Sequence, residues 1–293
     1  MPRLDRLATL YLFDPLRHYA LTSEAGIPIL MYHTISEATA RRTHPYYWTA
    51  TTPAVFANHM RHLHEQNYKT ISLLEAVSRI KIPSVKQEKV VVLTFDDGYQ
   101  DFFTQAYPIL GEYGFGATVF LPTAYIGETT PRSFKGADCL TWDQVRDLNR
   151  AGIHFGSHTV THPQLRTLSV EAVREEVRCS KETIEEKLGS PVKSFAYPYA
   201  LPETDRAFRR GLRGMLEEVG YEAGVSTIIG TADQSGDRFF MKRLPANSAD
   251  DRRLLDAKLA GAYDWLHAIQ YAWKLPSARF LGGPSPAWQN AAK

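Results

Sequence analysis

Two adjacent carboxylates, Asp96 and Asp97, follow directly on the apolar run of residues 90–93, which predicts a strand buried on both faces of a parallel sheet. Neighbouring side chains of a strand point to opposite faces, so two successive acids indicate that the strand has ended before them. Gly98 would then allow a tight turn. Ligands of α/β sheets and barrels bind at this carboxyl end, where the two acids could hold a metal ion or move a proton. A solvated turn with a helix N-cap is the alternative.

A pair of histidines, His158 and His162, lies about sixty residues further along, and the two are four residues apart. One helical turn would place both imidazoles on one side, and two imidazoles with one carboxylate can hold a divalent ion. Taken alone, two polar loop histidines are the alternative. The pair follows strand-like residues 153–155, so it should share a rim with Asp96 and Asp97, which favours a metal site.

A third stretch, SFAYPYA at residues 194–200, leads from an apolar strand into the turn Tyr197-Pro198-Tyr199. Alone, it indicates only a strand end with aromatic packing.

The elements that must position these side chains alternate between strand and helix. The expected strands are residues 27–35, 70–72, 90–93, 117–121, 153–156, 194–196, 222–226 and 239–244. The expected helices are residues 54–66, 74–80, 102–110, 141–151, 169–188, 205–219 and 250–274, with Thr141 and Gln144 as a capping box. Long loops are expected at residues 36–53 and 122–140, and a tail of low order at 276–293. The pattern predicts one domain, 1–293, with a mostly parallel sheet that forms either a barrel or a doubly wound sheet.

In this order the three stretches resemble the polysaccharide deacetylase family, the chitooligosaccharide deacetylase homology domain of carbohydrate esterase type. The similarity consists of TFDDG at 94–98, SHTVTH at 157–162 and YPY at 197–199, and it covers roughly residues 27–245. It implies an α/β fold, a distorted (β/α)7-type barrel. The AYPY form is similar to the branch that contains poly-N-acetylglucosamine deacetylases.

The resemblance implies that Asp97, His158 and His162 bind a divalent metal and that Asp96 is the catalytic base. Zn²⁺ is the expected ion, with Co²⁺, Ni²⁺ and Fe²⁺ as alternatives. The implied enzyme is a hydrolase of carbon–nitrogen bonds other than peptide bonds. It would remove N-acetyl groups from an amino-sugar polysaccharide, oligosaccharide or glycoconjugate and release acetate.

This chemistry explains the residue types. An acetamide is a poor electrophile, so a metal would polarise its carbonyl and lower the pKa of water toward 7, while Asp96 takes a proton from that water. The resulting oxyanion needs donors, and the backbone N–H of Tyr199 is the candidate, with Pro198 and Tyr197 beside it as oxyanion or substrate-binding residues.

Two departures from the family pattern affect the acid and base steps. Ala196 and Ala200 replace the Arg and Gly of Arg-x-Pro-Tyr-Gly, in which the Arg orients the base. No Leu-x-His strand follows Leu244, and His267 lies in a predicted helix, where it would be a poor substitute for the acid. His33, at the end of the first strand, is therefore our candidate for the acid or a substrate contact, with a structural histidine as the alternative.

Several further side chains keep two interpretations. Arg243 on the last strand would either reach the rim or face outward as a surface charge. Tyr46, Tyr47 and Trp48 would either stack on sugar rings or pack in a lid.

Composition limits the partners. The chain has 293 residues, 44% hydrophobic and 23% charged, with a formal net charge of +2, which gives no electrostatic argument for nucleic acid. Cys139 and Cys179 lack metal-ligand spacing and fit reduced thiols. No apolar run reaches the roughly 20 residues of a membrane span, and the N-terminus makes a poor signal peptide. We therefore expect a cytoplasmic protein.

The N-terminal residues also form an amphipathic pattern, which favours packing on the protein but leaves a peripheral membrane contact open. The pattern indicates no oligomeric state. The alternative function is a non-catalytic glycan-binding or scaffold protein that retains the barrel, suggested by the missing Arg and the missing C-terminal His.

Overall fold

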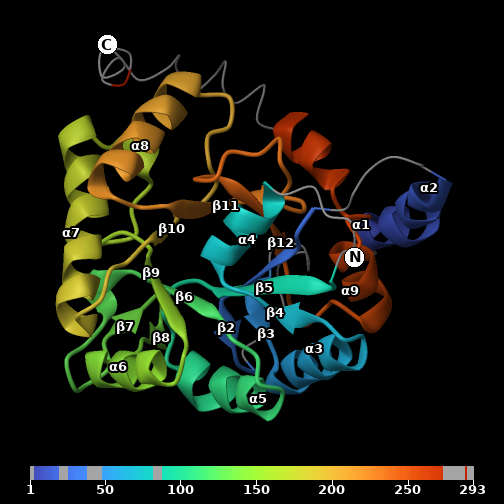
Figure 1. Cartoon of the computed structure of the whole chain (residues 1–293), viewed down its shortest axis with the longest axis horizontal. Helices are drawn as coiled ribbons and strands as arrows, with labels where there is room; N and C mark the ends of the chain where they lie inside the picture. Colours follow the sequence, from blue (N-terminus) through green and yellow to red (C-terminus); the bar gives the residue numbers. More distant parts are fainter. Residues whose placement is uncertain (1–2, 20–25, 38–47, 82–87, 273–287, 289–293) are drawn as a thin grey trace.

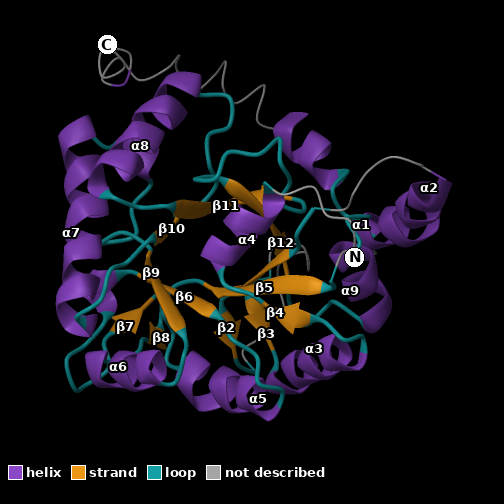
Figure 2. Ribbon diagram, in the orientation of Figure 1, coloured by secondary structure: helices purple, strands orange, loops and turns teal. Residues whose placement is uncertain are grey.

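The computed structural model describes residues 3–19, 26–37, 48–81, 88–272 and 288, and a closed ring of parallel strands occupies its centre (Figures 1 and 2). The ring follows the order β1-β12-β11-β10-β9-β6-β5, and β5 pairs back onto β1, so seven of the eight strands of this sheet form a barrel. Its members are β1 (Ile29–Tyr32), β5 (Val90–Phe95), β6 (Thr118–Leu121), β9 (His154–Ser157), β10 (Ser194–Ala196), β11 (Ala223–Ile229) and β12 (Met241–Pro245). The eighth strand, β4 (Lys69–Thr70), extends the sheet along the first residues of β5.

The barrel confirms the (β/α)7-type fold, and it excludes the open doubly wound sheet that the residue pattern also allowed. The ring is irregular, since β9 and β10 pair only at Phe195 with Ser157, and β11 carries a register shift between Val225 and Ile229. β5 is buried along its whole length, as its continuous apolar sequence predicts.

Helices cover the outside of the ring (Figure 2). They are α3 (Pro53–Glu65), α5 (Tyr107–Glu112), α6 (Trp142–Arg150), α7 (Val170–Leu188), α8 (Arg206–Val219) and α9 (Arg252–Leu259). The predicted capping box at Thr141 and Gln144 is present, and Ser169 caps α7 by accepting a hydrogen bond from the backbone of Ala172.

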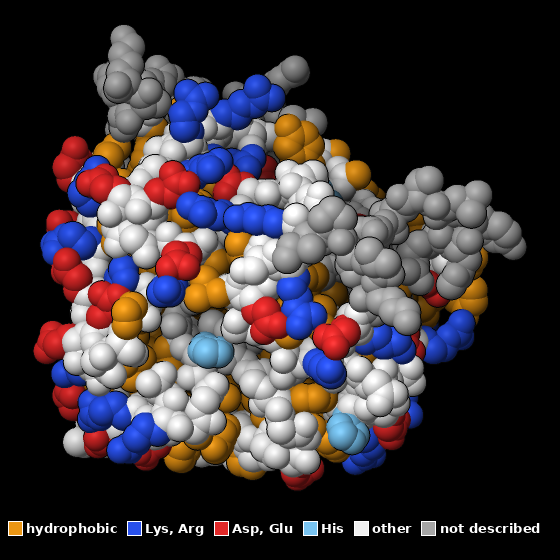
Figure 3. All heavy atoms as spheres, in the orientation of Figure 1, with side chains coloured by type: hydrophobic (Ala, Val, Ile, Leu, Met, Phe, Trp, Pro, Cys, Tyr) orange, Lys and Arg blue, Asp and Glu red, His pale blue; other side chains and the backbone are white. Residues whose placement is uncertain are grey.

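One helix, α4 (Leu73–Ile80), closes an end of the barrel and lies across its middle in Figure 1. Its side chains Leu73 and Ala76 join the apolar cluster inside the ring, which includes Ile29, Val92 and Met241. The barrel end with the strand N-termini is therefore filled, which leaves the carboxyl end for a site. Acidic and basic side chains are interspersed over the face seen in Figure 3.

Short elements complete the described chain. They are α1 (Leu4–Ala8), η1 (Thr9–Phe13), α2 (Asp14–Tyr19), β2 (Thr34–Ile35), β3 (Ala50–Thr51), η3 (Phe102–Ala106), η4 (Thr123–Tyr125), β7 (Ser133–Phe134), β8 (Ala137–Asp138) and η5 (Leu165–Thr167). No described helix is both long enough and apolar enough to cross a membrane.

Some predicted boundaries were wrong. The helix expected over residues 250–274 is interrupted after α9 by a turn at Gly261, whose φ is +81°, and a second helical stretch begins at residue 266. The loop expected at 122–140 contains the hairpin β7–β8. Tyr46, Tyr47 and the tail 276–293, apart from Trp288, lie outside the described residues.

Candidate metal centre and active site

Asp96 points into the barrel because it continues the inward side of β5. Val92 belongs to the apolar cluster inside the ring, and Thr94 and Asp96 follow it at steps of two residues. Asp96 is 2% exposed. A carboxylate at this depth needs a cation or several hydrogen-bond donors.

Arg243 supplies that cation from β12, which only β1 separates from β5 in the ring. It follows the inward-facing Met241 by two residues on β12, so it also points inward, and it is fully buried. Its Nη1 and Nη2 each donate to one oxygen of Asp96, both at 2.7 Å, and its Nε donates to the carbonyl of Ser226 at 2.9 Å. Burial would raise the pKa of Asp96, but the Arg243 guanidinium outweighs it and holds that pKa below its usual range.

Asp97 turns out of the strand in the left-handed region, with φ at +71°, and Gly98 follows at +59°. The positive φ favours glycine at this position, and a Cβ there would also have to displace the Leu121 side chain, which it would meet at 2.9 Å. The turn directs the Asp97 carboxylate toward His158 and His162, with its Oδ1 at 3.6 Å and 3.2 Å from their respective Nε2 atoms.

The two histidines lie in a loop rather than on the helical turn expected from their spacing. Thr159 and His162 have φ of +70° and +55°, and the Thr159 hydroxyl accepts a hydrogen bond from the His162 backbone. Glu176 of α7 fixes the loop by accepting hydrogen bonds from the backbone N–H groups of Val160 and Thr161 at 2.8 and 2.9 Å. Tertiary contacts therefore set the orientation of the imidazoles, and the role of Glu176 was missed in the sequence.

The imidazole of His158 suits a metal ligand. His158 Nδ1 lies 2.8 Å from the carbonyl of Ala196, which can only accept, so Nδ1 carries the proton and Nε2 presents its lone pair toward Asp97. Burial lowers the pKa of His158 to about 4, which keeps it neutral at neutral pH.

One ligand atom from each of Asp97, His158 and His162 lies within 4.8 Å of the others, and all three side chains are buried. Asp97 Oδ1 and His162 Nδ1 have no hydrogen-bond partner among the described residues. A buried carboxylate oxygen without a hydrogen-bond donor, facing two imidazole nitrogens, is the arrangement expected of a set of metal ligands. The residues therefore fit a divalent cation.

Strained backbone is concentrated around this cluster. Non-glycine residues rarely adopt positive φ, and such positions tend to occur at functional sites. Of the six described, only Asn67, at the end of α3, lies away from the cluster, and the others are Asp97, Lys135, Thr159, His162 and Tyr199.

His33 lies at the edge of this cluster, as its position after the first strand predicts. Its Nε2 is 3.9 Å from Asp96 Oδ2, and its side chain is 19% exposed. Burial lowers the pKa of His33, although the Asp96 and Asp97 carboxylates act in the opposite direction.

The three residues of the turn Tyr197-Pro198-Tyr199 lie in different surroundings. The ring of Tyr199 is 45% exposed and meets His162 edge-on at 4.6 Å, and no described group accepts a hydrogen bond from its backbone N–H. Pro198 is buried beside it. Tyr197 instead packs in the core against Phe208 of α8, so its side chain does not face the cluster.

The hairpin β7–β8 brings a cation to the mouth of the site. Lys135 and Gly136 form its tip with φ of +51° and +84°, as a two-residue hairpin turn requires. Lys135 Nζ lies 3.4 Å from Asp97 Oδ2 and 4.5 Å from the centre of the Phe134 ring. The Lys-Gly pair inside the predicted long loop was the available signal for this turn.

Comparisons with known proteins agree with this geometry. The family model described as polysaccharide deacetylase matches residues 84–223. YxkH of Bacillus subtilis, whose own assignment as a polysaccharide deacetylase is inferred, is 31% identical over 222 residues, which cover 75% of this chain and 71% of YxkH.

Two further proteins extend the comparison. The poly-beta-1,6-N-acetyl-D-glucosamine N-deacetylase of Escherichia coli strain K12 is 32% identical over 105 residues, which cover 33% of this chain and only 16% of that enzyme. The solved structure of the Streptococcus pyogenes deacetylase PplD, in complex with acetate, superposes with a TM-score of 0.67 and 26% identity over 81% of this chain and 99% of PplD.

Proposed function

The chain belongs to the polysaccharide deacetylase family, and on that premise we propose that it is a metal-dependent hydrolase that removes N-acetyl groups from an amino-sugar polysaccharide, oligosaccharide or glycoconjugate. The observation that carries this proposal is the approach of Asp97, His158 and His162 to within 4.8 Å beside the buried Asp96. Asp with two His suits Zn²⁺, Co²⁺, Ni²⁺ or Fe²⁺, and Zn²⁺ is our choice.

The three ligands would hold the ion, and an ion bound there would polarise the acetamide carbonyl and lower the pKa of the attacking water. Asp96 would take a proton from that water. Arg243 keeps this carboxylate ionised and fixes its plane through two hydrogen bonds of 2.7 Å. Arg243 would thus orient the base, which is the role of the family's Arg that Ala196 replaces in this chain.

Tyr199 and His33 would complete the reaction. The backbone N–H of Tyr199, for which the described residues supply no acceptor, is available to the oxyanion that would form at the acetyl carbonyl oxygen. His33, whose Nε2 is 3.9 Å from Asp96 Oδ2, would pass the proton that Asp96 takes from the water to the leaving amine as the carbon–nitrogen bond breaks, so that acetate and the free amino sugar are released. The neutral sugar rings would meet the exposed ring of Tyr199.

The substrate class rests on the relatives. The Escherichia coli homologue, whose alignment covers a third of this chain, is named for poly-beta-1,6-N-acetyl-D-glucosamine. The solved structure of PplD contains acetate, which would be the product here. A cytoplasmic location stays a prediction.

Metal content and acetate release test the proposal together. The wild-type protein should bind about one Zn²⁺ per chain and release acetate from an N-acetylglucosamine oligosaccharide, with activity lost in chelator and restored by metal. His158→Ala should lose the ion, whereas Asp96→Asn should keep the ion and lose acetate release. Acetate release that survives both chelator and His158→Ala would contradict the metal mechanism.

The absence of a Leu-x-His strand favours one competing function, a glycan-binding protein that retains the barrel. That function predicts glycan binding by the wild type with no acetate release in any metal. The Arg243–Asp96 pair argues against it, because a binding protein has no need to orient a buried carboxylate beside a metal site.

A further inference from the structure

The first helical segment is attached to the barrel along one side. It consists of α1, the π-helical turn η1 and α2, and Figure 1 shows it on one flank of the molecule, with α2 extending away from the barrel. Its contacts lie on the side that faces α9 and the loop after β12.

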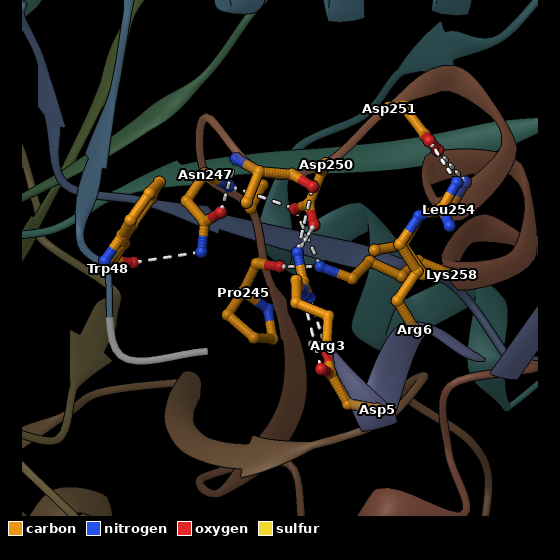
Figure 4. Close-up of polar contacts among 12 residues, drawn as sticks. Arg3, Asp5, Arg6, Trp48, Pro245, Asn247, Asp250, Asp251, Leu254 and Lys258 are labelled. Carbon is orange, nitrogen blue, oxygen red and sulfur yellow. Dashed lines mark hydrogen bonds and ion pairs between the residues drawn. The ribbon is translucent and has the colours of Figure 1, made fainter. Parts of the chain in front are cut away.

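Buried charges fix the base of this segment (Figure 4). Arg3 donates to Asp5 at 2.6 Å and to Asp250 at 3.2 Å, and Lys258 of α9 donates to the other oxygen of Asp250 at 2.8 Å. Arg6 pairs with Asp251 at the start of α9. Several charge-assisted hydrogen bonds fix the orientation of this helical segment on the barrel. The same side of the segment therefore always faces away from the protein.

Further contacts bury the side of this helical segment that faces the barrel. Leu10 packs against Ala257 and Ala262, Phe13 stacks on Trp265 at 4.6 Å, and Thr9 accepts a hydrogen bond from the Trp265 indole. The inner side thus buries its own apolar and polar groups, and nothing described covers the outer side.

The outer side carries an apolar stripe. Of the eight large hydrophobic side chains exposed among the described residues, five belong to it, namely Leu4 at 70%, Leu7 at 44%, Tyr11 at 63%, Leu12 at 51% and Leu16 at 53%. Their spacing follows successive helical turns, so they form one face. Soluble surfaces rarely gather large apolar side chains this way unless they contact a partner.

One cation without an ion pair among the described residues borders the stripe. The guanidinium of the exposed Arg253 lies 5.8 Å from the centre of the Tyr11 ring, and no described carboxylate is within ion-pair distance of it. Arg6 and Arg252 lie nearby but are paired with Asp251 and Glu65, so Arg253 is the cation left for an external anion. Leucines and a tyrosine on one projecting helical segment, with this arginine beside them, form the pattern of a helix that lies in a membrane interface, with the cation toward anionic headgroups.

We propose that the stripe formed by Leu4, Leu7, Tyr11, Leu12 and Leu16 docks the protein on a lipid bilayer that carries anionic headgroups. A second copy of the chain could pack its stripe on this one, but the cation beside the stripe, Arg253, would then be present on both copies, whereas an anionic bilayer supplies the opposite charge. The cavity at the foot of α4 is lined partly by Lys81, Asp233 and Arg238, which do not match leucines. A planar bilayer needs no groove, and a projecting helix reaches it without obstruction from the barrel.

Flotation with lipid vesicles tests this inference with the full chain. The wild type should float with vesicles of phosphatidylcholine containing about one third phosphatidylglycerol, and less with phosphatidylcholine alone. Leu12→Gln/Leu16→Gln should reduce the bound fraction about tenfold. Arg253→Gln should reduce only the preference for anionic vesicles, by about fivefold.

Ile269→Gln is the matched control, because Ile269 is a hydrophobic residue of similar exposure, 44%, outside the stripe. It should float like the wild type, and circular dichroism should show that all variants are folded. The proposal is overturned if the wild type does not float, if Ile269→Gln loses binding as much as the double variant, or if the stripe variants instead abolish a dimer seen by light scattering.

Discussion

Two groups of buried charges lie beyond the carboxyl ends of the barrel strands, and they differ in whether their polar atoms are paired. In the anchor network of Arg3, Asp5, Asp250 and Lys258, both oxygens of each carboxylate accept a hydrogen bond (Figure 4). In the cluster of Asp97, His158 and His162, Asp97 Oδ1 and His162 Nδ1 accept or donate none within the described chain.

The difference separates charges that are paired within the fold from polar atoms that are available to a ligand. A buried polar group without a partner costs free energy, so a native fold keeps one only where something else compensates. Asp96 stands between the two cases, since Arg243 pairs both its oxygens although it lies beside the unpaired cluster. Variants in each group should therefore change different properties.

The largest effect is expected for Asp97→Asn. It should weaken Zn²⁺ binding by at least about a hundredfold and remove acetate release, because the carboxylate is the only anionic ligand of the cluster. The stability of the metal-free protein should fall by no more than about 1 kcal/mol, since Oδ1 has no hydrogen bond to lose and Oδ2 loses only its contact with the half-exposed Lys135. Calorimetric metal titration and urea unfolding in chelator measure the two quantities. If the metal-free variant were destabilised by several kcal/mol, Asp97 would be a residue that stabilises the fold, as Asp5 and Asp250 do.

Next in size is Arg243→Met, which leaves the Asp96 carboxylate buried without its partner. Loss of one member of a buried pair costs about 3–5 kcal/mol, and the misplaced base should lower acetate release as well. Metal binding should persist, because Arg243 does not contact the three ligands. Arg243→Lys is the control, because Lys keeps the positive charge but cannot form the bidentate hydrogen bonds to Asp96. This variant should recover more of the stability than of the acetate release. Full activity in Arg243→Met would contradict the orienting role.

Lys258→Met should destabilise the protein by a similar amount, about 3–5 kcal/mol, yet leave metal affinity and acetate release per folded molecule unchanged. The double variant Asp250→Asn/Lys258→Met removes both charges and should recover much of the loss. Urea unfolding of the single and double variants measures the coupling. A change in metal affinity would mean that the two groups of charges are not independent.

The smallest effect is expected from mild acid. Burial would raise the pKa of Asp5 and of Asp250, but Arg3 and the Tyr263 hydroxyl hold the pKa of Asp5, and Lys258 with Arg3 that of Asp250, below the usual 3.8. A carboxyl group with a lowered folded pKa stabilises the fold above its unfolded pKa, and this contribution disappears as pH falls below about 4 through the folded value. Unfolding midpoints in chelator should fall over that range, and less so in Asp250→Asn/Lys258→Met. An equal decline in both proteins would assign the acid sensitivity to other groups.

Local sequence was enough for the elements and for most of the cluster. A continuous apolar run that stops at Asp96 and Asp97 specifies a buried strand and its end, and the capping residues Thr141 and Ser169 specify helix starts. These signals act within a few residues, so one sequence contains them. The histidine spacing placed His158 and His162 together, although the helical turn inferred from it was wrong.

Only the tertiary structure decided the contacts between segments that are distant in the sequence. Arg243 reaches Asp96 across 147 positions of sequence, and the inward side of β12 follows from its neighbours in the ring, which no local pattern specifies. Glu176 holds the histidine loop from a helix that follows it, and Lys135 reaches Asp97 only because a hairpin turns over the site. The sequence thus determined which residues could do chemistry, whereas closure of the barrel determined which cation pairs with Asp96, because that pairing depends on another strand of the ring and not on adjacent residues.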